Sequence, residues 1–362
     1  MKIFIVCTRM TGGGAERVGV MLANGFAMKG NDVSIITDVY QKATYDIDNH
    51  VKVLPLHTKT KNKITKWLSS LYMIRHHVSN NRPDVIIGIM HTCSAFSKIA
   101  CIGLDIPVVL TIHHALERIE TYPLPFTERM IDTISPLFYN ITTVLTKADK
   151  EYWAKRKNIV VMPNPSSFPQ STGTLHKENV LLAAGRISDW YCKGFDILIE
   201  AWGEIASKYP EWKLEIAGNG SKDNFDFLKE KAIDNGVVDR IEFLGYRTDM
   251  QNLYQKAAIY VLSSRSEGLP MVLIEAMSQG CACVATDFKG RTKEIITNDD
   301  EGILCNPEDV DALAKGMERL IIDDEYRNRL QQNAIKRSEY FRLDNIVGMW
   351  ESLLSKLVRN KR

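Results

Sequence analysis

The sequence predicts an α/β protein with two doubly wound parallel sheets, one in each half of the chain. Short β-branched runs alternate with longer helical patterns from end to end. The runs are apolar on both faces, as expected for parallel strands covered by helices on each side. A length of 362 residues is enough for two domains. Together these observations predict two Rossmann-like domains that face a central cleft.

Five apolar runs are the expected strands of the first domain, and a sixth run leads to the domain boundary. They are Lys2–Thr8, Asp32–Thr37, Asp84–Gly88, Pro107–Ile112, Ile141–Leu145 and Ile159–Met162. The last run leads into Pro163-Asn164-Pro165, and a polar stretch over residues 166–178 follows it. Because prolines and clustered polar residues mark loops, we expect the N-terminal domain to cover residues 1–163.

A second alternating series fills residues 164–342. Its expected strands are Asn179–Ala184, Lys213–Ala217, Arg240–Leu244, Ala258–Leu262 and Ala282–Ala285. The expected helices are Phe195–Lys208, Asn224–Asn235, Met271–Gln279 and Pro307–Asp323. A final amphipathic helix, Leu343–Val358, carries Trp350, and we expect the segment 343–362 to pack back on the first domain.

Composition excludes several classes of protein. The formal net charge is only +2, so no nucleic acid is expected as a partner. The seven cysteines lie mostly in apolar runs and form no CxxC pair, which is typical of reduced thiols in a cytoplasmic protein. The N-terminus does not resemble a signal peptide, and no stretch approaches the roughly 20 apolar residues that span a bilayer. We therefore expect a cytoplasmic protein, and peripheral contact with the inner membrane stays open.

A glycine loop follows the first expected strand. Gly12, Gly13 and Gly14 precede a helix with one apolar face. Glycines let a ligand approach the backbone, and a helix N-terminus offers free N–H groups, so a phosphate or a sugar hydroxyl is the natural guest. A dinucleotide fingerprint is disfavoured because Arg17 occupies the position of its third glycine. A tight turn without a ligand stays open.

The most specific motif is Ser-Glu-Gly-Leu-Pro-Met-Val-Leu-Ile-Glu-Ala-Met, residues 266–277. Glu267 lies in the loop at the carboxyl end of a strand, where open α/β sheets bind ligands. A helix starts at about Pro270 or Met271, and Glu275 lies about one turn into it. The two carboxylates can reach different parts of one hydroxyl-rich ligand, and a carboxylate accepts paired hydrogen bonds from vicinal ribose hydroxyls. A helix cap with a surface glutamate is the structural alternative.

Cationic and glycine residues at other strand ends point to the same edge of the second sheet. Gly185-Arg186 ends its first strand, and Lys193-Gly194 opens its first helix. Such a pair can hold a diphosphate and stabilise its growing charge as it leaves, although solvated surface charge stays an alternative. Glycine turns at Gly218 and at Gly245-Tyr246 leave room for a ligand, and Tyr246 could lie against a flat base.

These motifs give the chain a resemblance to the family-4 retaining glycosyltransferases of GT-B fold, over essentially its whole length. The motifs are GGGAER, TIHH, GR…KG, LEIAGNG, EFLGY and SEGLPMVLIEAM. The resemblance implies that Glu275 binds the nucleotide ribose and that Glu267 contacts the donor sugar. It also implies that Arg186 and Lys193 hold the diphosphate. The donor site is then completed by Gly12, Gly13, Gly14, Gly185, Gly218, Gly245, Tyr246, Gly268, Leu269 and Pro270.

The resemblance also assigns the histidine after the fourth apolar run. His113 matches the family's strand-end histidine near the donor sugar and the reacting centre. His114 follows it where Asn, Asp or Ser is more common, so which imidazole faces the cleft stays open. Six residues separate Arg186 from Lys193, one more than is usual in the family, which leaves the placement of the lysine open.

The resemblance implies front-face substitution, in which the leaving diphosphate helps to deprotonate the incoming hydroxyl. No carboxylate in the motifs is placed as a covalent nucleophile, and no DxD-like metal motif stands at a strand end. We therefore expect turnover without a metal or another cofactor, with Arg186 and Lys193 in the place of a divalent ion.

Residues 49–83 contain no acidic residue. Ile64, Trp67, Leu68, Leu71 and Tyr72 recur there at helical spacing, with Lys61, Lys63 and Lys66 beside them. A basic amphipathic helix suits an anionic bilayer or a lipid-linked acceptor. An ordinary helix that packs its apolar face on the first sheet is the alternative, with Trp67 in the core.

The same resemblance suggests bacterial enzymes that extend polyprenyl-diphosphate-linked oligosaccharides, typically from UDP-hexose or UDP-N-acetylhexosamine. We therefore expect a hexosyltransferase of surface-polysaccharide or glycan assembly. A nucleotide-sugar epimerase of the same fold and a catalytically silent nucleotide-sugar-binding protein are the competing interpretations.

Overall fold

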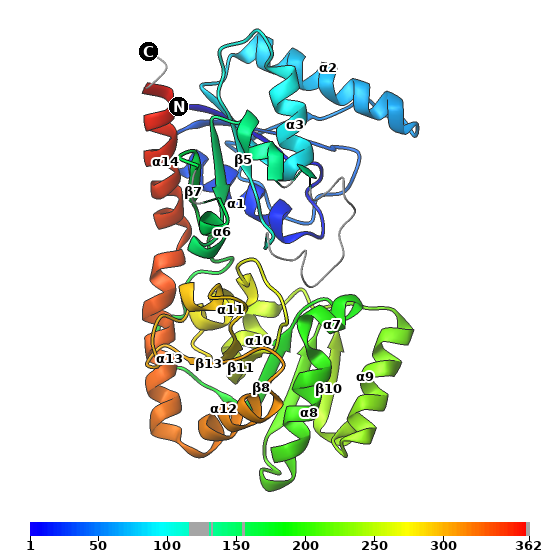
Figure 1. Ribbon diagram of the computed structural model, residues 1–362, viewed down its shortest axis with the longest axis vertical. Helices are drawn as coiled ribbons and strands as arrows, with labels where there is room; N and C mark the ends of the chain where they lie inside the picture. The colour runs from blue at the N-terminus through cyan, green and yellow to red at the C-terminus, as the bar shows by residue number, and fades with distance from the viewer. Residues whose placement is uncertain (116–129, 132, 154–155, 360–362) are drawn as a thin grey trace. The chain divides into compact units, whose positions relative to one another are not determined.

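The computed structural model describes residues 1–115, 130–131, 133–153 and 156–359. The chain forms two compact units (Figure 1). One consists of Met1–Pro165 with Leu343–Arg362, and the other of Ser166–Arg342. The division thus falls after Pro165, two residues beyond the expected one.

The first unit has an all-parallel sheet at its centre. Within the described residues, seven strands follow the order β3-β2-β1-β4-β5-β6-β7. Their bounds are β1 Lys2–Val6, β2 Asp32–Thr37, β3 Lys52–Pro55, β4 Val85–Ile89, β5 Val108–Thr111, β6 Ile141–Val144 and β7 Ile159–Val161. The strand order reverses direction between β1 and β4, which makes this the switch point of the sheet.

Helices cover this sheet, and the last helix of the chain returns to it. Their bounds are α1 Gly14–Met28, α2 Lys63–Asn81, α3 Met90–Ala100, α6 Lys147–Glu151, α14 Leu343–Arg359 and the 3₁₀ helix η1 Ser135–Phe138. Helices α2 and α3 share a buried cluster with alternate residues of β1, β4 and β5. Helix α14 packs on α1, where a Cβ on Gly25 would lie 2.5 Å from the Val347 side chain, so glycine allows the close approach.

The second unit repeats the architecture. Among its residues, six parallel strands follow the order β10-β9-β8-β11-β12-β13. Their bounds are β8 Glu178–Ala184, β9 Lys213–Ala217, β10 Ile241–Gly245, β11 Ala257–Leu262, β12 Ala282–Thr286 and β13 Ile303–Cys305. Its helices are α7 Trp190–Lys193, α8 Phe195–Ile205, α9 Lys222–Asp234, α10 Met250–Lys256, α11 Met271–Ser278, α12 Val310–Ile322 and α13 Asp324–Ser338.

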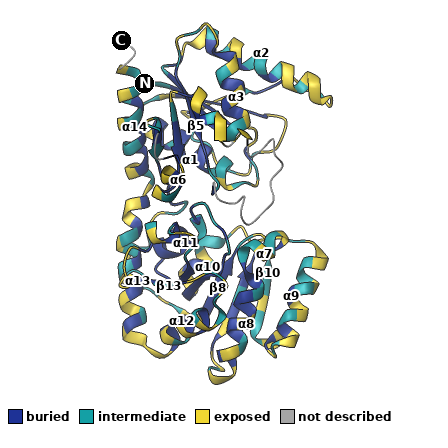
Figure 2. Cartoon of the chain, viewed as in Figure 1, coloured by how far each residue is buried: buried dark blue, intermediate teal, exposed yellow. Residues whose placement is uncertain are grey.

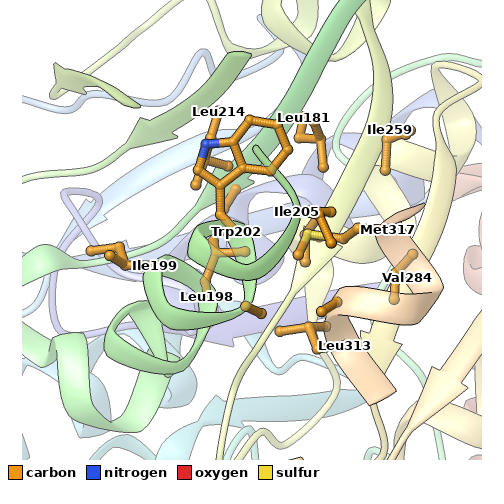
Figure 3. Packing of buried hydrophobic residues seen from close by; sticks show 14 of the residues in the cluster. Leu181, Leu198, Ile199, Trp202, Ile205, Leu214, Ile259, Val284, Leu313 and Met317 are labelled. Atoms are coloured by element: carbon orange, nitrogen blue, oxygen red, sulfur yellow. The ribbon is translucent and has the colours of Figure 1, made fainter. Parts of the chain in front are cut away.

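Trp202 of α8 lies at the centre of the core of this second unit (Figure 3). The indole is fully buried near Leu181 and Leu214, and the same cluster contains Leu313 and Met317 of α12. Because each strand offers every second residue to this face, α8, α9 and α12 cover one side of the sheet. Burial is densest along the strands of both units (Figure 2).

Two edge strands were not expected from the sequence. Both residues at the start of β3, Lys52 and Val53, are exposed, and β13 has only three residues. Edge strands of this kind lack the continuous apolar run that marks a strand covered on both faces. The helices α3, α10 and α13 were also missed, and α3 begins directly after β4 without a loop to mark its start.

Candidate functional site

A connected group of polar side chains lies at the switch point of the second sheet. Strands β8 and β11 are parallel neighbours there, so the loops after them leave the same edge of the sheet. The loop after β8 carries Arg186 and leads to Lys193, and the loop after β11 carries Glu267. Ligands of open α/β sheets bind at this position.

Lys193 and Glu267 form an ion pair in this site. Lys193 Nζ donates to Glu267 Oε1 over 2.7 Å, and the side chains are only 17% and 13% exposed. Ser264 Oγ donates to the same oxygen over 2.8 Å. Burial by itself would lower the pKa of Lys193, but the charge and the hydrogen bond of Glu267 outweigh burial and raise it. The ammonium is therefore charged at neutral pH.

Arg186 occupies a more open position. Its side chain is 69% exposed, and Nη2 lies 3.3 Å from Asp189 Oδ2. The 3₁₀ helix η2 Ile187–Asp189 and the short α7 separate it from Lys193. Lys193 thus ends α7 instead of opening the long helix α8, which corrects its expected placement.

Arg265 fastens the loop after β11 to the loop after β8. Its guanidinium binds Asp196 through two hydrogen bonds of 2.8 and 2.9 Å and donates to the Tyr191 carbonyl over 2.6 Å. Its backbone N–H donates to the Cys192 carbonyl, and the Ser263 hydroxyl donates to the Lys193 carbonyl over 2.9 Å. These contacts fix both ends of the Lys193–Glu267 pair. Arg265 was not predicted as a site residue, although it directly precedes the most specific motif of the chain.

Three glycines close the carboxyl ends of three neighbouring strands. Gly185 follows β8, Gly218 follows β9, and Gly245 ends β10 with φ 66°. A Cβ on Gly218 would lie 1.7 Å from the Gly185 carbonyl oxygen, and a Cβ on Gly185 would lie 3.2 Å from the Lys193 side chain. Glycine is therefore required at Gly218, whereas a side chain at Gly185 would have to displace the lysine by a few tenths of an ångström. Tyr246 is 72% exposed.

Glu275 lies deeper than Glu267. It belongs to α11, which begins at Met271 as expected, and it is only 4% exposed. Tyr254 Oη donates to Glu275 Oε2 over 3.2 Å. Burial, followed by the charge of Glu275, raises the pKa of Tyr254 well above its usual value, so the phenol keeps the proton that it donates. In the connecting loop, Gly268 is half-buried, whereas Leu269 and Pro270 are buried.

The glycine loop of the first unit follows β1. Gly12 has φ 68°, a left-handed conformation that favours glycine, and open space surrounds the positions where a Cβ would stand on Gly12 and Gly14. Gly13 precedes α1, and its carbonyl accepts a hydrogen bond from Tyr45. Gly13 has no side chain that could cap α1, and the carboxylate of Glu16 lies beside it in the first turn.

His113 follows β5 in the same unit. Its Nδ1 lies 3.1 Å from Asn164 Oδ1, and its Nε2 lies 3.0 Å from Thr111 Oγ1. Burial lowers the pKa of His113 from 6.5 to about 4, while the contact with Asn164 acts in the opposite direction. The imidazole is therefore neutral at pH 7. His114 lies beside another ring, with its centroid 5.8 Å from that of His91.

The basic helix forms as expected, but the apolar residues of its N-terminal half are exposed. In α2, Ile64, Trp67, Leu68 and Tyr72 are between 63% and 72% exposed, and the N-terminal half is mainly yellow in Figure 2. The core of the unit receives Ile74 and Val78 instead. The interpretation as an ordinary core-packing helix is thus wrong for these four exposed residues.

The lysines of this segment divide into two kinds. Lys66 Nζ lies 3.1 Å from Oδ2 of the buried Asp38, which also contacts His57. Lys66 is therefore part of an ion pair, and its expected role toward an acceptor or a membrane stays a prediction. Lys61 and Lys63 are exposed, and neither has an ion pair among the described residues.

No described helix is long and apolar enough to cross a membrane. Within the same residues, no three His, Cys, Asp or Glu side chains are grouped so that they could hold a metal ion.

Two family models match the chain, one over each unit. The model described as Glycosyltransferase Family 4 matches residues 12–165, and the model described as Glycosyl transferases group 1 matches residues 166–337. The first match thus includes the glycine loop and His113. The second includes the four charged candidate site residues Arg186, Lys193, Glu267 and Glu275.

Similar proteins extend over nearly the whole chain. An uncharacterized glycosyltransferase of Haemophilus influenzae is 28% identical over 361 residues, which cover 97% of this chain and 99% of that protein. A Campylobacter jejuni protein, GalNAc-alpha-(1->4)-GalNAc-alpha-(1->3)-diNAcBac-PP-undecaprenol alpha-1,4-N-acetyl-D-galactosaminyltransferase, is 29% identical over 366 residues, which cover 99% of each chain.

Solved structures share the fold at lower identity. Anabaena HepE in complex with UDP and glucose superposes with a TM-score of 0.78 at 20% identity, covering 98% of this chain and 99% of that one. Sucrose-phosphate synthase of Thermosynechococcus elongatus superposes with a TM-score of 0.80 at 16% identity, covering 99% of both chains.

Proposed function

Because this chain belongs to the family-4 glycosyltransferases and has their GT-B fold, we propose that it transfers a hexosyl or N-acetylhexosaminyl residue from a nucleotide-sugar to a lipid-linked glycan, with retention of anomeric configuration. The observation that carries this proposal is the ion pair of Lys193 with Glu267 at the switch point of the second sheet. A charged ammonium in a largely buried site is suited to a diphosphate.

The donor would be held by three kinds of contact in the second unit. Lys193 and the more exposed Arg186 would bind the diphosphate oxygens. Glu275, whose carboxylate is buried and held by Tyr254, would accept hydrogen bonds from the ribose hydroxyls. Glu267 would contact the donor sugar while it orients Lys193.

The proposed transfer step is a front-face substitution. The acceptor oxygen forms a bond to the anomeric carbon on the face from which the diphosphate departs, and the bond from that carbon to the phosphate oxygen breaks. The electron pair of the broken bond stays on the diphosphate, which takes the proton of the acceptor hydroxyl. The ammonium of Lys193 stabilises the charge that develops, because it is already oriented before the reaction.

His113 is suited to a neutral role in this reaction. Its lowered pKa means that the imidazole carries no charge at pH 7. Asn164 and Thr111 fix the plane of the ring through both nitrogens. A neutral ring with both nitrogens engaged would not serve as a standing acid, and it would bind a sugar hydroxyl only in exchange for its contact with Thr111.

The relatives suggest the chemical class of donor and acceptor. The printed name of the Campylobacter jejuni relative describes the addition of N-acetylgalactosamine to a PP-undecaprenol-linked glycan. UDP is bound in the HepE structure. We therefore include in the proposal a UDP-linked donor, an acceptor on a polyprenyl diphosphate, surface-polysaccharide or glycan assembly, action at the cytoplasmic face of the membrane, and turnover without a metal.

A coupled assay for UDP release tests the proposal. The protein is incubated with UDP-hexoses and UDP-N-acetylhexosamines, with and without a polyprenyl-diphosphate-linked glycan, in EDTA and in magnesium. Release that requires the glycan is expected, with the same rate in both buffers and with a product whose anomeric NMR signals show retention. Donor interconversion without an acceptor would indicate an epimerase, and binding without release or interconversion would indicate a silent binding protein.

A further inference from the structure

The first unit carries an apolar groove that the donor site does not use. A cavity of about 540 Å³ lies between α2, α3 and residues 130–131 and 134–139. Its described walls are mostly apolar and include Trp67, Phe96, Ile99, Ile134 and Phe138. This volume falls in the range of small-molecule sites, about 300–1,000 Å³.

The groove is elongated. A second hollow of about 470 Å³ continues along α3 and shares Ala95, Ile99, Phe138 and Tyr139 with the first. Ala95, Ile99 and Ile102 recur at helical spacing and line this second hollow. Two hollows joined by common walls fit an extended hydrocarbon chain better than a compact ligand.

The walls of this groove are exposed to an unusual degree. Trp67 is 63% exposed, Phe138 is 62% exposed, and Ile102 is 71% exposed. Large contiguous apolar patches are rare on soluble proteins and mark binding sites. The edge of the Trp67 ring meets Phe96 with centroids 5.2 Å apart, so the tryptophan is held at the mouth of the groove instead of lying free.

Positive charge lies next to this mouth. Lys63 and Trp67 are four residues apart on α2 and therefore lie on one face of the helix. Lys59 and Lys61 precede the helix and are exposed. None of these three lysines has an ion pair among the described residues, and residues 49–83 contain no acid that would compete for them.

Resting on the proposed function, we propose that this groove binds the polyprenyl chain of the lipid-linked acceptor. An apolar channel beside unpaired lysines is complementary to a hydrocarbon chain that ends in a diphosphate. The apolar walls bury the hydrocarbon, and the lysine ammonium groups bind the diphosphate oxygens. Lys63 contacts the diphosphate, and Trp67 covers the first isoprene units. The polyprenyl group contributes binding energy to the acceptor alone and does not affect the donor site.

The test uses the full-length protein and acceptors with the same glycan on diphosphates of increasing chain length, from no prenyl group to farnesyl and geranylgeranyl. The acceptor KM is expected to fall as the chain lengthens. The double variant Trp67→Gln/Ile99→Gln is expected to raise KM for the longest chain by about tenfold for each lost side chain. The kcat, the donor KM and the KM of the chain-free acceptor are expected to stay unchanged. Ile322→Gln, which replaces an isoleucine of the second unit that is 64% exposed, is the matched control.

Three outcomes would overturn the inference. One is an acceptor KM that does not depend on chain length. Another is an unaltered KM in the double variant. The third is a variant that loses binding to acceptor-free anionic vesicles but keeps the wild-type KM for the farnesyl acceptor, since the bilayer would then be the occupant.

Calorimetry with geranylgeranyl diphosphate measures the groove without any turnover. The wild type is expected to bind this probe, and the double variant is not. Failure of the proposed function, seen as no sugar transfer to any acceptor, is therefore distinguishable from failure of the groove.

Discussion

Replacing Lys193 by methionine separates the catalytic role of this residue from its structural one. Methionine keeps an unbranched side chain of similar length but removes the charge. The Glu267 carboxylate would then remain in a site where it is 13% exposed, with the Ser264 hydroxyl as its remaining neighbour at 2.8 Å. Two losses are expected, one in turnover and one in stability.

The magnitudes follow from the environment of the pair. Loss of one preoriented group that stabilises developing charge costs about 10²–10³ in kcat, or about 2.7–4 kcal/mol. Removal of one partner from a buried ion pair costs about 3–5 kcal/mol, and the residual exposure of both side chains favours the lower value. For a unit of this size, about 3 kcal/mol lowers Tm by roughly 6–12 °C.

The double variant Lys193→Met/Glu267→Gln provides the decisive comparison. It removes both charges, so most of the lost Tm should return, while kcat should stay at the level of the single variant or below it. Thermal unfolding and UDP release are measured on the same preparations. A Lys193→Met protein with unchanged Tm would refute the structural reasoning, and a kcat within about threefold of the wild type would refute the catalytic role.

Three further outcomes are expected. His113 has a pKa of about 4 in the folded chain and an ordinary value of 6.5 when unfolded, so the unfolded state binds the proton first and up to about 3 kcal/mol of stability is lost as the pH falls from 6.5 to 4. Urea unfolding of His113→Gln should show a flatter dependence over this window, and an equally steep one would contradict the assignment. In Arg265→Lys the lysine cannot form the bidentate pair with Asp196, so kcat should fall about tenfold while the donor Kd in calorimetry stays unchanged. A loss of Tm alone would show that Arg265 has a purely structural role. Glu275→Ala should weaken UDP binding at least tenfold in calorimetry, whereas Glu267→Ala should chiefly lower kcat, and equal effects of both on binding would undo the division of roles.

Much of the fold could be predicted because buried parallel strands have a local sequence signal, a continuous apolar run. The run DVSIIT predicted β2 with its observed bounds, and KLEIA did the same for β9. Each strand is buried on both faces, so its apolar run is continuous. The edge strand β3 could not be found in this way, since one of its faces meets solvent and its residues look like those of a loop.

The candidate site was predicted in kind but not in its connections. The residue types and their strand-end positions identified Lys193 and Glu267, yet their contact joins residues that are 74 positions apart. The same limit hid the pairing of Lys66 with Asp38, which lies 28 positions away. Periodicity showed that α2 has an apolar face, but only tertiary packing decides whether such a face is covered.

The chemistry of an ammonium group explains how Lys193 can be both paired and functional. A lysine has three N–H donors, and among the described residues one of them is used by Glu267. The other two remain for diphosphate oxygens, so donor binding does not require the pair to break. The carboxylate instead holds the ammonium in place through their hydrogen bond. It also keeps the ammonium charged, as the raised pKa of Lys193 indicates. Since that pKa is raised above 10.5, the contribution of the lysine charge to stability is fully present at neutral pH and is lost as the pH rises through the folded value. The pair therefore imposes no limit on turnover across the neutral range, and any pH dependence there must come from other groups.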